Sequence, residues 1–449
     1  MTPEKVKLLT EEILPAAVKL HTDRLRVLPL TAPLLVPRFA EGSSVCKHYT
    51  VPEDHHTRGV DADMVLYVAA GPGFMFGVPC ATVGAERPVV GALRFVPADY
   101  GGLRVNVRAV AHVIAHALGF GYEQMRALGM VAGDPLTAVR HQAKTSVASA
   151  TVLKEARAHY NCKTLENVEL EVDNYTGVVE PHWPQRLAKG ELMSDSLGFG
   201  VGRYTALTLA AFEDMKFYRA DFSMAEPMAW GSNSGCGLFS GSCLENGVSL
   251  YPGMFCDKIG FRCTADRASY GMCSTERDSE TQALKLEGDC PTVDPTFLPN
   301  SSGIPFATVC SEDMSAYFPH MLHGDDSWCL DGQNLKVTNP KAPSGQAVGG
   351  VCARVKCEAG RVQVRYRGNE EWHECPEGSS ITPQSEHFRS GNIMCPSYEE
   401  VCTVAANGSS LLVPGRGRRR DGAGGSAAAR TAGSLLLLVL TTVAVVVPL

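Results

Sequence analysis

The sequence has little excess charge of either sign. Its 41 lysines and arginines stand against 48 aspartates and glutamates, so the net charge is −7 over 449 residues. A balance this mild gives no basis for nucleic-acid binding, which normally uses a strong basic surplus. Hydrophobic residues make up 45% of the chain and charged residues 20%, as in soluble globular proteins. The length is sufficient for two or three domains.

Cysteine is scarce early in the chain and frequent later. Only three of the 16 cysteines precede residue 230, whereas 11 lie from Cys256 to Cys402. No pair of CxxC motifs is present, which excludes the usual four-thiolate zinc site. A disulfide framework formed in an oxidising compartment fits this pattern better than free, buried cysteines in a cytosolic protein. Gly, Pro and Ser also become frequent, so we expect a separate, disulfide-rich domain over residues 239–411.

The first residues, MTPEKVKLLTEE, contain no apolar signal core. A disulfide-rich surface protein needs such a signal, so we expect that the true start is missing from this chain. Three Asn-x-Ser/Thr sequons, at Asn174, Asn300 and Asn407, permit glycosylation.

The last fifteen residues, LLLLVLTTVAVVVPL, carry no charge and follow a small, polar stretch over 422–434. This order is typical of a glycosylphosphatidylinositol-anchor signal, whose apolar tail is removed. The candidate attachment sites are Gly422, Gly424, Gly425 and Ser426. A tail-anchored helix is the alternative, although a membrane span needs about 20 apolar residues. We therefore expect a stalk and anchor signal over 412–449, attached to the membrane at the cell surface.

Hydrophobic periodicity predicts both helices and strands. The first predicted helix covers residues 8–27. Thr10 is its expected N-cap, and Pro15 lies inside it, where proline is unfavourable. The predicted helices are 8–27, 105–120, 146–159 and 203–217, the last of them amphipathic, and the predicted strands are 63–69 and 89–96. Long regular elements are expected to fade after residue 239.

His112 and His116 stand four residues apart on the helix predicted over 105–120. This spacing places both imidazoles on one face, where they can bind one Zn²⁺. A lone HxxxH is weak evidence, because chance pairs on helix surfaces are frequent. Gly119 lies three residues after His116, as in the zinc-peptidase pattern HExxHxxGxxH. Tyr122 takes the place of the third histidine of that pattern.

A third ligand must therefore come from further along the chain, and the candidates are His141, His159 and His182. His182 lies eleven residues before Met193, and Met193 is the last residue of the sequence Glu-Leu-Met. A methionine turn that follows the third histidine is the other signature of the metzincin peptidases.

With HxxAHALGF, His182, ELM and GRYTALTLAAFEDMKFYRADFSMAEPMAWG, the chain resembles the leishmanolysin family of surface metalloproteases over roughly residues 4–449. The resemblance implies an α+β fold, with a metzincin-like zinc-peptidase catalytic module and a disulfide-rich C-terminal domain. It also implies one Zn²⁺ held by His112, His116 and His182, with Met193 in the methionine turn. Protein or peptide substrates are implied as well.

By the same resemblance, the zinc helix would belong to an N-terminal catalytic subdomain over 1–121. The third ligand and the methionine turn would belong to a central domain over 122–238. Disulfides Cys46–Cys80 and Cys162–Cys236 would fit, although spacing alone does not settle the connectivity. The family begins with a signal peptide and a pro-segment, and we expect both to be missing from this chain.

Val113 is the second departure from the family, because it stands where zinc peptidases carry their catalytic glutamate. That glutamate takes a proton from the attacking water and delivers it to the leaving amine, and valine can do neither. General acid–base catalysis contributes on the order of 10²–10⁴-fold, so the predicted defect is large. Glu123 is the nearest acid downstream and could substitute only if the chain folds back.

Three interpretations follow. The first is a zinc-binding surface protein with little or no endopeptidase activity and a binding role, such as cell adhesion. The second is a working zinc endopeptidase, if Val113 is a sequence artefact or another acid compensates. The third is a non-functional, truncated copy.

Overall fold

The computed structural model describes fourteen segments of the chain, which contain all the residues discussed below except where stated. The described residues are 2–39, 45–71, 73–84, 86–96, 102–133, 145–172, 181–195, 200–277, 284–286, 288–299, 305–338, 347–413, 434–435 and 438–444. The elements up to residue 121 are α1 (Pro3–Leu8), a π-helical turn (Leu9–Ile13), α2 (Leu14–Thr22), β1 (Leu25–Val27), a 3₁₀ turn (Val45–His48), α3 (Glu53–Thr57), β2 (Met64–Ala70), β3 (Phe76–Val83), β4 (Arg87–Phe95) and α4 (Gly102–Ala117).

The next part of the chain is mainly helical. Its elements are α5 (Tyr122–Ala127), β5 (Val131–Ala132), β6 (Ser146–Val147), α6 (Ala150–Tyr160), β7 (Val168–Glu169), α7 (Gln185–Ala188), α8 (Ala206–Asp214), β8 (Arg219–Ala220), a 3₁₀ turn (Phe222–Met224) and α9 (Gly237–Ser240).

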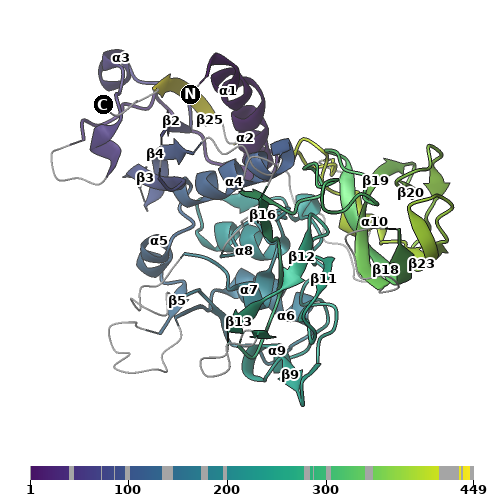
Figure 1. The fold of residues 1–449 in the computed structure, drawn as a ribbon. Coiled ribbons are helices and arrows are strands. Elements are labelled where there is room, and N and C mark those ends of the chain that lie inside the picture. Colours follow the sequence, from purple (N-terminus) through teal and green to yellow (C-terminus); the bar gives the residue numbers. More distant parts are fainter. Residues whose placement is uncertain are drawn as a thin grey trace.

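The remainder is mainly strand, and its strands between residues 327 and 394 form a lobe at the right of Figure 1, in green and yellow-green, whereas the strands before them lie beside the helical part. Its elements are β9 (Leu244–Glu245), β10 (Val248–Ser249), β11 (Phe261–Cys263), β12 (Tyr270–Cys273), β13 (Thr275–Arg277), β14 (Leu284–Leu286), β15 (Val293–Asp294), β16 (Phe297–Pro299), β17 (Pro305–Ala307), β18 (Ser327–Val337), β19 (Ala347–Glu358), β20 (Arg361–Arg365), β21 (His373–Glu374), β22 (Ser380–Ile381), β23 (Phe388–Met394) and α10 (Tyr398–Val401), followed by β24 (Ser434–Leu435) and β25 (Leu438–Ala444).

The N-terminal sheet supports the helix that carries the first two histidines. Its strand order is β25-β2-β4-β3, with β2 parallel to β4 and β3 antiparallel to β4. Helix α4 packs on β3 and β4, and α2 packs on α4 (Figure 1). The α4 side chains Val107, Val110, Ala111 and Ile114 are at most 2% exposed, so this helix lies at the centre of the main core.

The last described residues belong to the same sheet. Strand β25 pairs in parallel with β2, on the side of β2 opposite β4. The predicted attachment sites at residues 422–426 lie outside the described residues, as does most of the stalk. No helix in the described part of the chain combines enough length and hydrophobicity to cross a bilayer.

Eight disulfides pair all sixteen cysteines, as the prediction of a disulfide framework requires. Cys46 is bonded to Cys80 and Cys162 to Cys236, the two pairs that the resemblance implied. The other six join Cys243–Cys290, Cys256–Cys273, Cys263–Cys329, Cys310–Cys352, Cys357–Cys402 and Cys375–Cys395. The mixture of helices, strands and a disulfide-rich C-terminal part confirms the predicted α+β class.

The predicted strands 63–69 and 89–96 are confirmed as β2 and β4, but the first predicted helix is wrong in its boundaries. It begins at Pro3, where the Thr2 hydroxyl accepts a hydrogen bond from the Lys5 amide (3.4 Å). Thr10, the predicted N-cap, lies inside the helix and donates to the Val6 carbonyl. A π-helical turn precedes Pro15, which lies in the first turn of α2. Proline lacks an amide hydrogen but is tolerated in the first turn of a helix, so Pro15 does not break α2.

Two further predictions differ from the structure. Helix α8 is buried on all sides rather than amphipathic, because α6 and the main core cover it. The prediction that regular elements fade after residue 239 is also wrong, since β18 has 11 residues and β19 has 12. These two strands pair with each other, and disulfides at Cys329 and Cys352 tie them to distant segments, which local sequence patterns do not reveal.

Candidate metal centre

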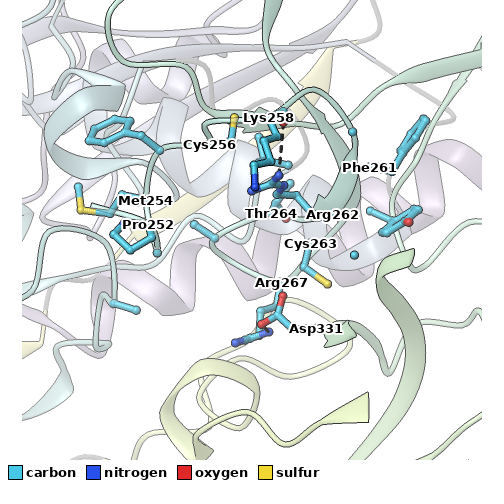
Figure 2. Close-up of a pocket in the computed structure, with 18 of the residues that line it drawn as sticks. Pro252, Met254, Cys256, Lys258, Phe261, Arg262, Cys263, Thr264, Arg267 and Asp331 are labelled. Atoms are coloured by element: carbon cyan, nitrogen blue, oxygen red, sulfur yellow. Dashed lines mark hydrogen bonds and ion pairs between the residues drawn. The ribbon is translucent and has the colours of Figure 1, made fainter. Parts of the chain in front are cut away.

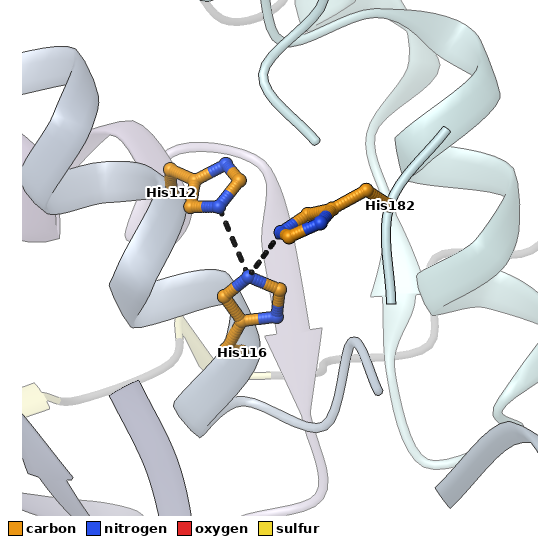
Figure 3. Close-up of side chains that lie close together, drawn as sticks. All are labelled: His112, His116 and His182. Atoms are coloured by element: carbon orange, nitrogen blue, oxygen red, sulfur yellow. Dashed lines mark hydrogen bonds between the residues drawn. The ribbon is translucent and has the colours of Figure 1, made fainter. Parts of the chain in front are cut away.

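Helix α4 and the segment after residue 181 bring three histidines together. His112 and His116 project from α4 toward His182, as Figure 3 shows. The Nε2 atom of His116 is 3.0 Å from Nε2 of His112 and 3.2 Å from Nε2 of His182. One donor atom from each ring lies within 4.8 Å of the other two, which is the compact arrangement that a single ion needs.

The end of α4 fixes the orientation of His116. The chain leaves the helix at Gly119, whose φ of +107° favours glycine. The Phe120 amide then donates to the Ala115 carbonyl (3.0 Å), which turns the Phe120 carbonyl back over the helix end. That carbonyl accepts a hydrogen bond from Nδ1 of His116 (2.7 Å). The glycine noted in the sequence thus helps to orient a candidate ligand.

The segment around Met193 connects the other two histidines. Nδ1 of His112 donates to the Leu192 carbonyl (2.6 Å). The Trp183 amide, next to His182, donates to the Met193 carbonyl (2.8 Å). Met193 itself is completely buried. The Glu-Leu-Met segment therefore contacts the backbone beside one histidine and the ring of another.

These hydrogen bonds determine which ring nitrogens are free to bind a metal. A carbonyl can only accept, so His112 and His116 must each carry their proton on Nδ1. Their Nε2 atoms then present lone pairs to each other at 3.0 Å, with no proton between them. Lone pairs that face each other repel unless a cation lies between them. The donor set therefore fits a zinc ion, which prefers neutral imidazole nitrogens.

Burial keeps all three imidazoles neutral. It lowers the pKa of His116 to about 4, and burial together with the nearby His116 lowers the pKa of His182 to about 3. The pKa of His112 is also well below its usual value, through burial and the two neighbouring histidines. Neutral imidazole is the form that binds metal, so the site is ready for an ion at neutral pH.

Asp195 supports the third histidine from behind. Its Oδ1 atom lies 3.9 Å from Nδ1 of His182, and its amide donates to the Trp183 carbonyl (2.9 Å). A carboxylate behind a ligand histidine orients the ring and increases its basicity, and losing it usually costs about 10–100-fold in metal affinity. Because 3.9 Å is longer than a hydrogen bond, we expect Asp195→Asn to weaken zinc binding by about 10-fold.

Competition with a chromophoric chelator measures that affinity. Asp54→Asn, at an exposed carboxylate paired with Arg58, is the control and should leave the zinc affinity unchanged. Equal affinities in Asp195→Asn and the unmodified protein would show that Asp195 does not support His182.

Val113 lies on α4 between the two histidines and is 6% exposed. Its carbonyl is covered by Gly77 of β3, so closely that a Cβ atom at Gly77 would be 1.7 Å from the Val113 oxygen. Any side chain at residue 77 must therefore push α4 away from the sheet. Gly77 is therefore a positioning residue for the metal helix, and no motif in the sequence points to it.

We expect Gly77→Ala to destabilise the protein by at least about 1–3 kcal/mol, the usual penalty for overpacking, and to weaken zinc binding. Thermal unfolding and zinc titration measure the two effects. Gly71→Ala is the matched control at the end of β2, since its added methyl group meets nothing within 4 Å. Equal unfolding midpoints for the two variants would contradict the proposed contact.

The cluster contains histidines alone. Among the described residues, no Asp or Glu oxygen joins the group of donor atoms. Glu123, considered as a substitute base, is on α5 with its side chain 74% exposed and paired with Arg126 (2.6 Å). It is therefore directed to the surface. Among the described residues, no carboxylate takes the place of the catalytic glutamate that is missing at residue 113.

The other candidate ligands are placed elsewhere. His159 donates through Nε2 to the Trp230 carbonyl (2.8 Å), so that nitrogen is already used. His141 lies outside the described residues. The sequence did not predict a role in the site for the Leu192 and Phe120 carbonyls, Asp195 or Gly77, because none of them belongs to a ligand motif.

Comparisons with known proteins agree with this geometry. A model of the leishmanolysin peptidase family matches residues 1–408. The chain is also 32% identical to leishmanolysin of Leishmania major over 93% of its own length and 73% of that protein. The chain belongs to the leishmanolysin family. A leishmanolysin homolog of Crithidia fasciculata is 33% identical over 91% of the chain and 65% of that protein.

A more distant relative supports the same assignment over part of the chain. A leishmanolysin-like peptidase of Drosophila melanogaster is 27% identical over 48% of the chain. Membership of the leishmanolysin family means membership of a zinc metallopeptidase family, whose substrates are proteins or peptides.

Proposed function

We propose that this leishmanolysin-family chain binds one zinc ion through His112, His116 and His182 but has little or no endopeptidase activity. The observation that carries the proposal is the combination of three converging Nε2 atoms with Val113 between two of them. The histidines supply the metal-binding part of the site. The acid–base part is missing from the described residues.

A zinc ion held there would polarise a peptide carbonyl and make a water molecule more acidic. The chain's own residues would orient the ligand rings through the Leu192 and Phe120 carbonyls. Hydrolysis also requires a group that accepts a proton from the water and passes it to the leaving amine. An isopropyl side chain holds no exchangeable proton, so Val113 cannot serve in either step.

Zinc content and proteolysis test this proposal together. We expect one zinc per full-length chain by mass spectrometry, and none in His112→Ala/His116→Ala. We also expect no chelator-sensitive cleavage of an unstructured protein by the unmodified chain. Chelator-sensitive cleavage would overturn the claim of inactivity, whereas a zinc-free wild-type chain would overturn the metal site.

We further propose that the protein acts at the cell surface by binding proteins, for example in adhesion, and is attached by a lipid anchor that replaces its apolar tail. The tail follows the compositional order of an anchor signal. Removal of the tail would also remove β25 from its pairing with β2. Release from cells by a phosphatidylinositol-specific phospholipase supports the anchor, and retention after that treatment contradicts it.

A further inference from the structure

A cavity of about 1160 Å³ lies apart from the metal centre, beside the disulfide-rich lobe. The loop 251–260, strand β11 and the start of β19 all contribute residues to its lining. Figure 2 shows the residues of the loop and of β11 around it. None of the three metal-centre histidines lines it. Its volume exceeds the roughly 300–1,000 Å³ of a pocket for a drug-sized molecule, so a short peptide segment can enter.

Aromatic rings form much of the wall. Trp230 and Phe255 pack edge to face with centroids 5.3 Å apart. Tyr270 stacks on Phe261 at 5.4 Å and meets Phe318 edge-on at 5.3 Å. Trp230, Phe255 and Tyr270 are at most 3% exposed. The surface on which an apolar or aromatic side chain can pack therefore comes from the partly exposed Phe261 and Phe318, which the buried Tyr270 holds in place.

The cavity also carries a small excess of positive charge, because three cationic and two acidic side chains line it. Arg267 pairs with both Asp331 (2.9 Å) and Glu400 (2.8 Å), the acids that line the same cavity, so these two carboxylates exceed its charge by one. Lys258 and Arg262, which also line it, form no ion pair within the described residues. Arg262 donates instead to the Lys258 carbonyl (3.3 Å), which holds the two cationic residues together (Figure 2).

His320 adds a buried polar group to the wall. Its side chain is 1% exposed, and neither ring nitrogen has a hydrogen-bond partner in the described part of the chain. A buried polar group without a partner is unfavourable by about 1–3 kcal/mol, which a ligand that supplies a donor or acceptor would relieve. The unpartnered ring is thus an observation, independent of charge, that points to a ligand.

We propose that this cavity binds an acidic peptide segment that carries an aromatic side chain. Lys258 and Arg262 would pair with the carboxylates, the aromatic wall would hold the ring, and His320 would hydrogen-bond with the peptide. Two cations on a chain of net charge −7 make no track for a nucleic acid and no broad basic face for a membrane. The site is separate from the metal centre and does not depend on its activity.

Fluorescence anisotropy with the full chain tests the proposal. The probe is a fluorescein-labelled peptide, Gly-Asp-Phe-Glu-Trp-Asp-Gly, and one comparison peptide has lysine in place of each acid. A second comparison peptide has alanine in place of both aromatic residues. We expect the first peptide to bind at least 10-fold more tightly than either comparison peptide, with or without a zinc chelator.

Charge reversal at the cavity gives the decisive comparison. Lys258→Glu/Arg262→Glu should weaken binding of the acidic peptide at least 10-fold, whereas Lys336→Glu, at an exposed strand position outside the cavity, should not. Lys258→Glu alone changes only an exposed side chain and should weaken binding in the same direction, which guards against misfolding of the double variant.

Equal affinity in the double variant and the unmodified chain would overturn the proposal, and so would loss of binding on zinc removal. Binding of phosphatidylserine vesicles that the double variant abolishes, without any binding of the acidic peptide, would also overturn it.

Discussion

Val113→Glu should give this protein a chelator-sensitive endopeptidase activity about 10²–10⁴-fold above that of the unmodified chain. This is the range that a positioned general acid–base group contributes, or about 3–5 kcal/mol of transition-state stabilisation. The substitution adds a carboxylate between His112 and His116 without changing any ligand. The residue is 6% exposed, and burial there would raise the pKa of the new carboxyl toward neutrality, which suits a general base.

The control for this gain is Val113→Gln. Glutamine has nearly the same size as glutamate and makes similar contacts, but it cannot exchange a proton. Cleavage of an unstructured protein should therefore appear with Val113→Glu and remain absent with Val113→Gln, while both bind one zinc. If the unmodified chain already cleaves as fast as Val113→Glu, another group acts as the base and the proposal of inactivity is wrong.

Glu226→Gln should strongly destabilise the protein. The Glu226 carboxylate lies between two buried arginines, Arg108 of α4 (2.6 Å) and Arg24 (3.2 Å), and all three side chains are fully buried. Removing its charge leaves two buried cations without a counter-ion, which costs about 3–5 kcal/mol. At roughly 2–4 °C per kcal/mol, the unfolding midpoint should fall by about 6–20 °C.

An exposed ion pair provides the comparison. Glu53 pairs with Arg38 on the surface, and both side chains are about two-thirds exposed. Glu53→Gln should therefore change stability by at most about 1 kcal/mol. A midpoint shift of Glu226→Gln as small as that of Glu53→Gln would show that the buried triad does not hold α4 in place.

The same triad predicts a loss of stability in acid. Burial alone would raise the pKa of Glu226, but the charges of Arg108 and Arg24 outweigh it and lower this pKa to about 2. A carboxyl whose pKa is lower in the folded state contributes its full stability above its unfolded pKa near 4.5. That contribution should be lost as the pH falls from about 4.5 to about 2, and Glu226→Gln should show a weaker acid dependence over this interval.

Several features of the candidate site were predictable from the sequence because they follow from local spacing. Residues four apart on a helix share a face, so His112 and His116 were predicted to lie together. Gly119 was noted for its place in a motif, and its positive φ explains why glycine suits the end of α4. The choice of His182 over His141 and His159 was not available from spacing and came from a resemblance to a family.

Other predictions failed because distant packing overrides local pattern. The periodicity over 203–217 predicted an amphipathic helix, but α8 is enclosed by α6 and the core. The Gly-, Ser- and Cys-rich sequence after residue 239 suggested short elements, yet β18 and β19 are long because each pairs with the other and is tied by disulfides. Pairings between residues far apart in the chain leave little signal in a single sequence.

By itself the sequence determined the identity of the candidate metal ligands on α4, the missing carboxyl group at Val113 and the oxidised state expected of the cysteines. Each of these depends on residue type or on spacing within one helix. The tertiary structure alone decided that the Nε2 atoms of three histidines face one point, because carbonyls of Leu192 and Phe120 hold the Nδ1 protons of two of them. It also decided that Gly77 sets the position of α4 and that Glu226 joins two arginines, since these contacts form only when strands and helices from distant parts of the chain pack together.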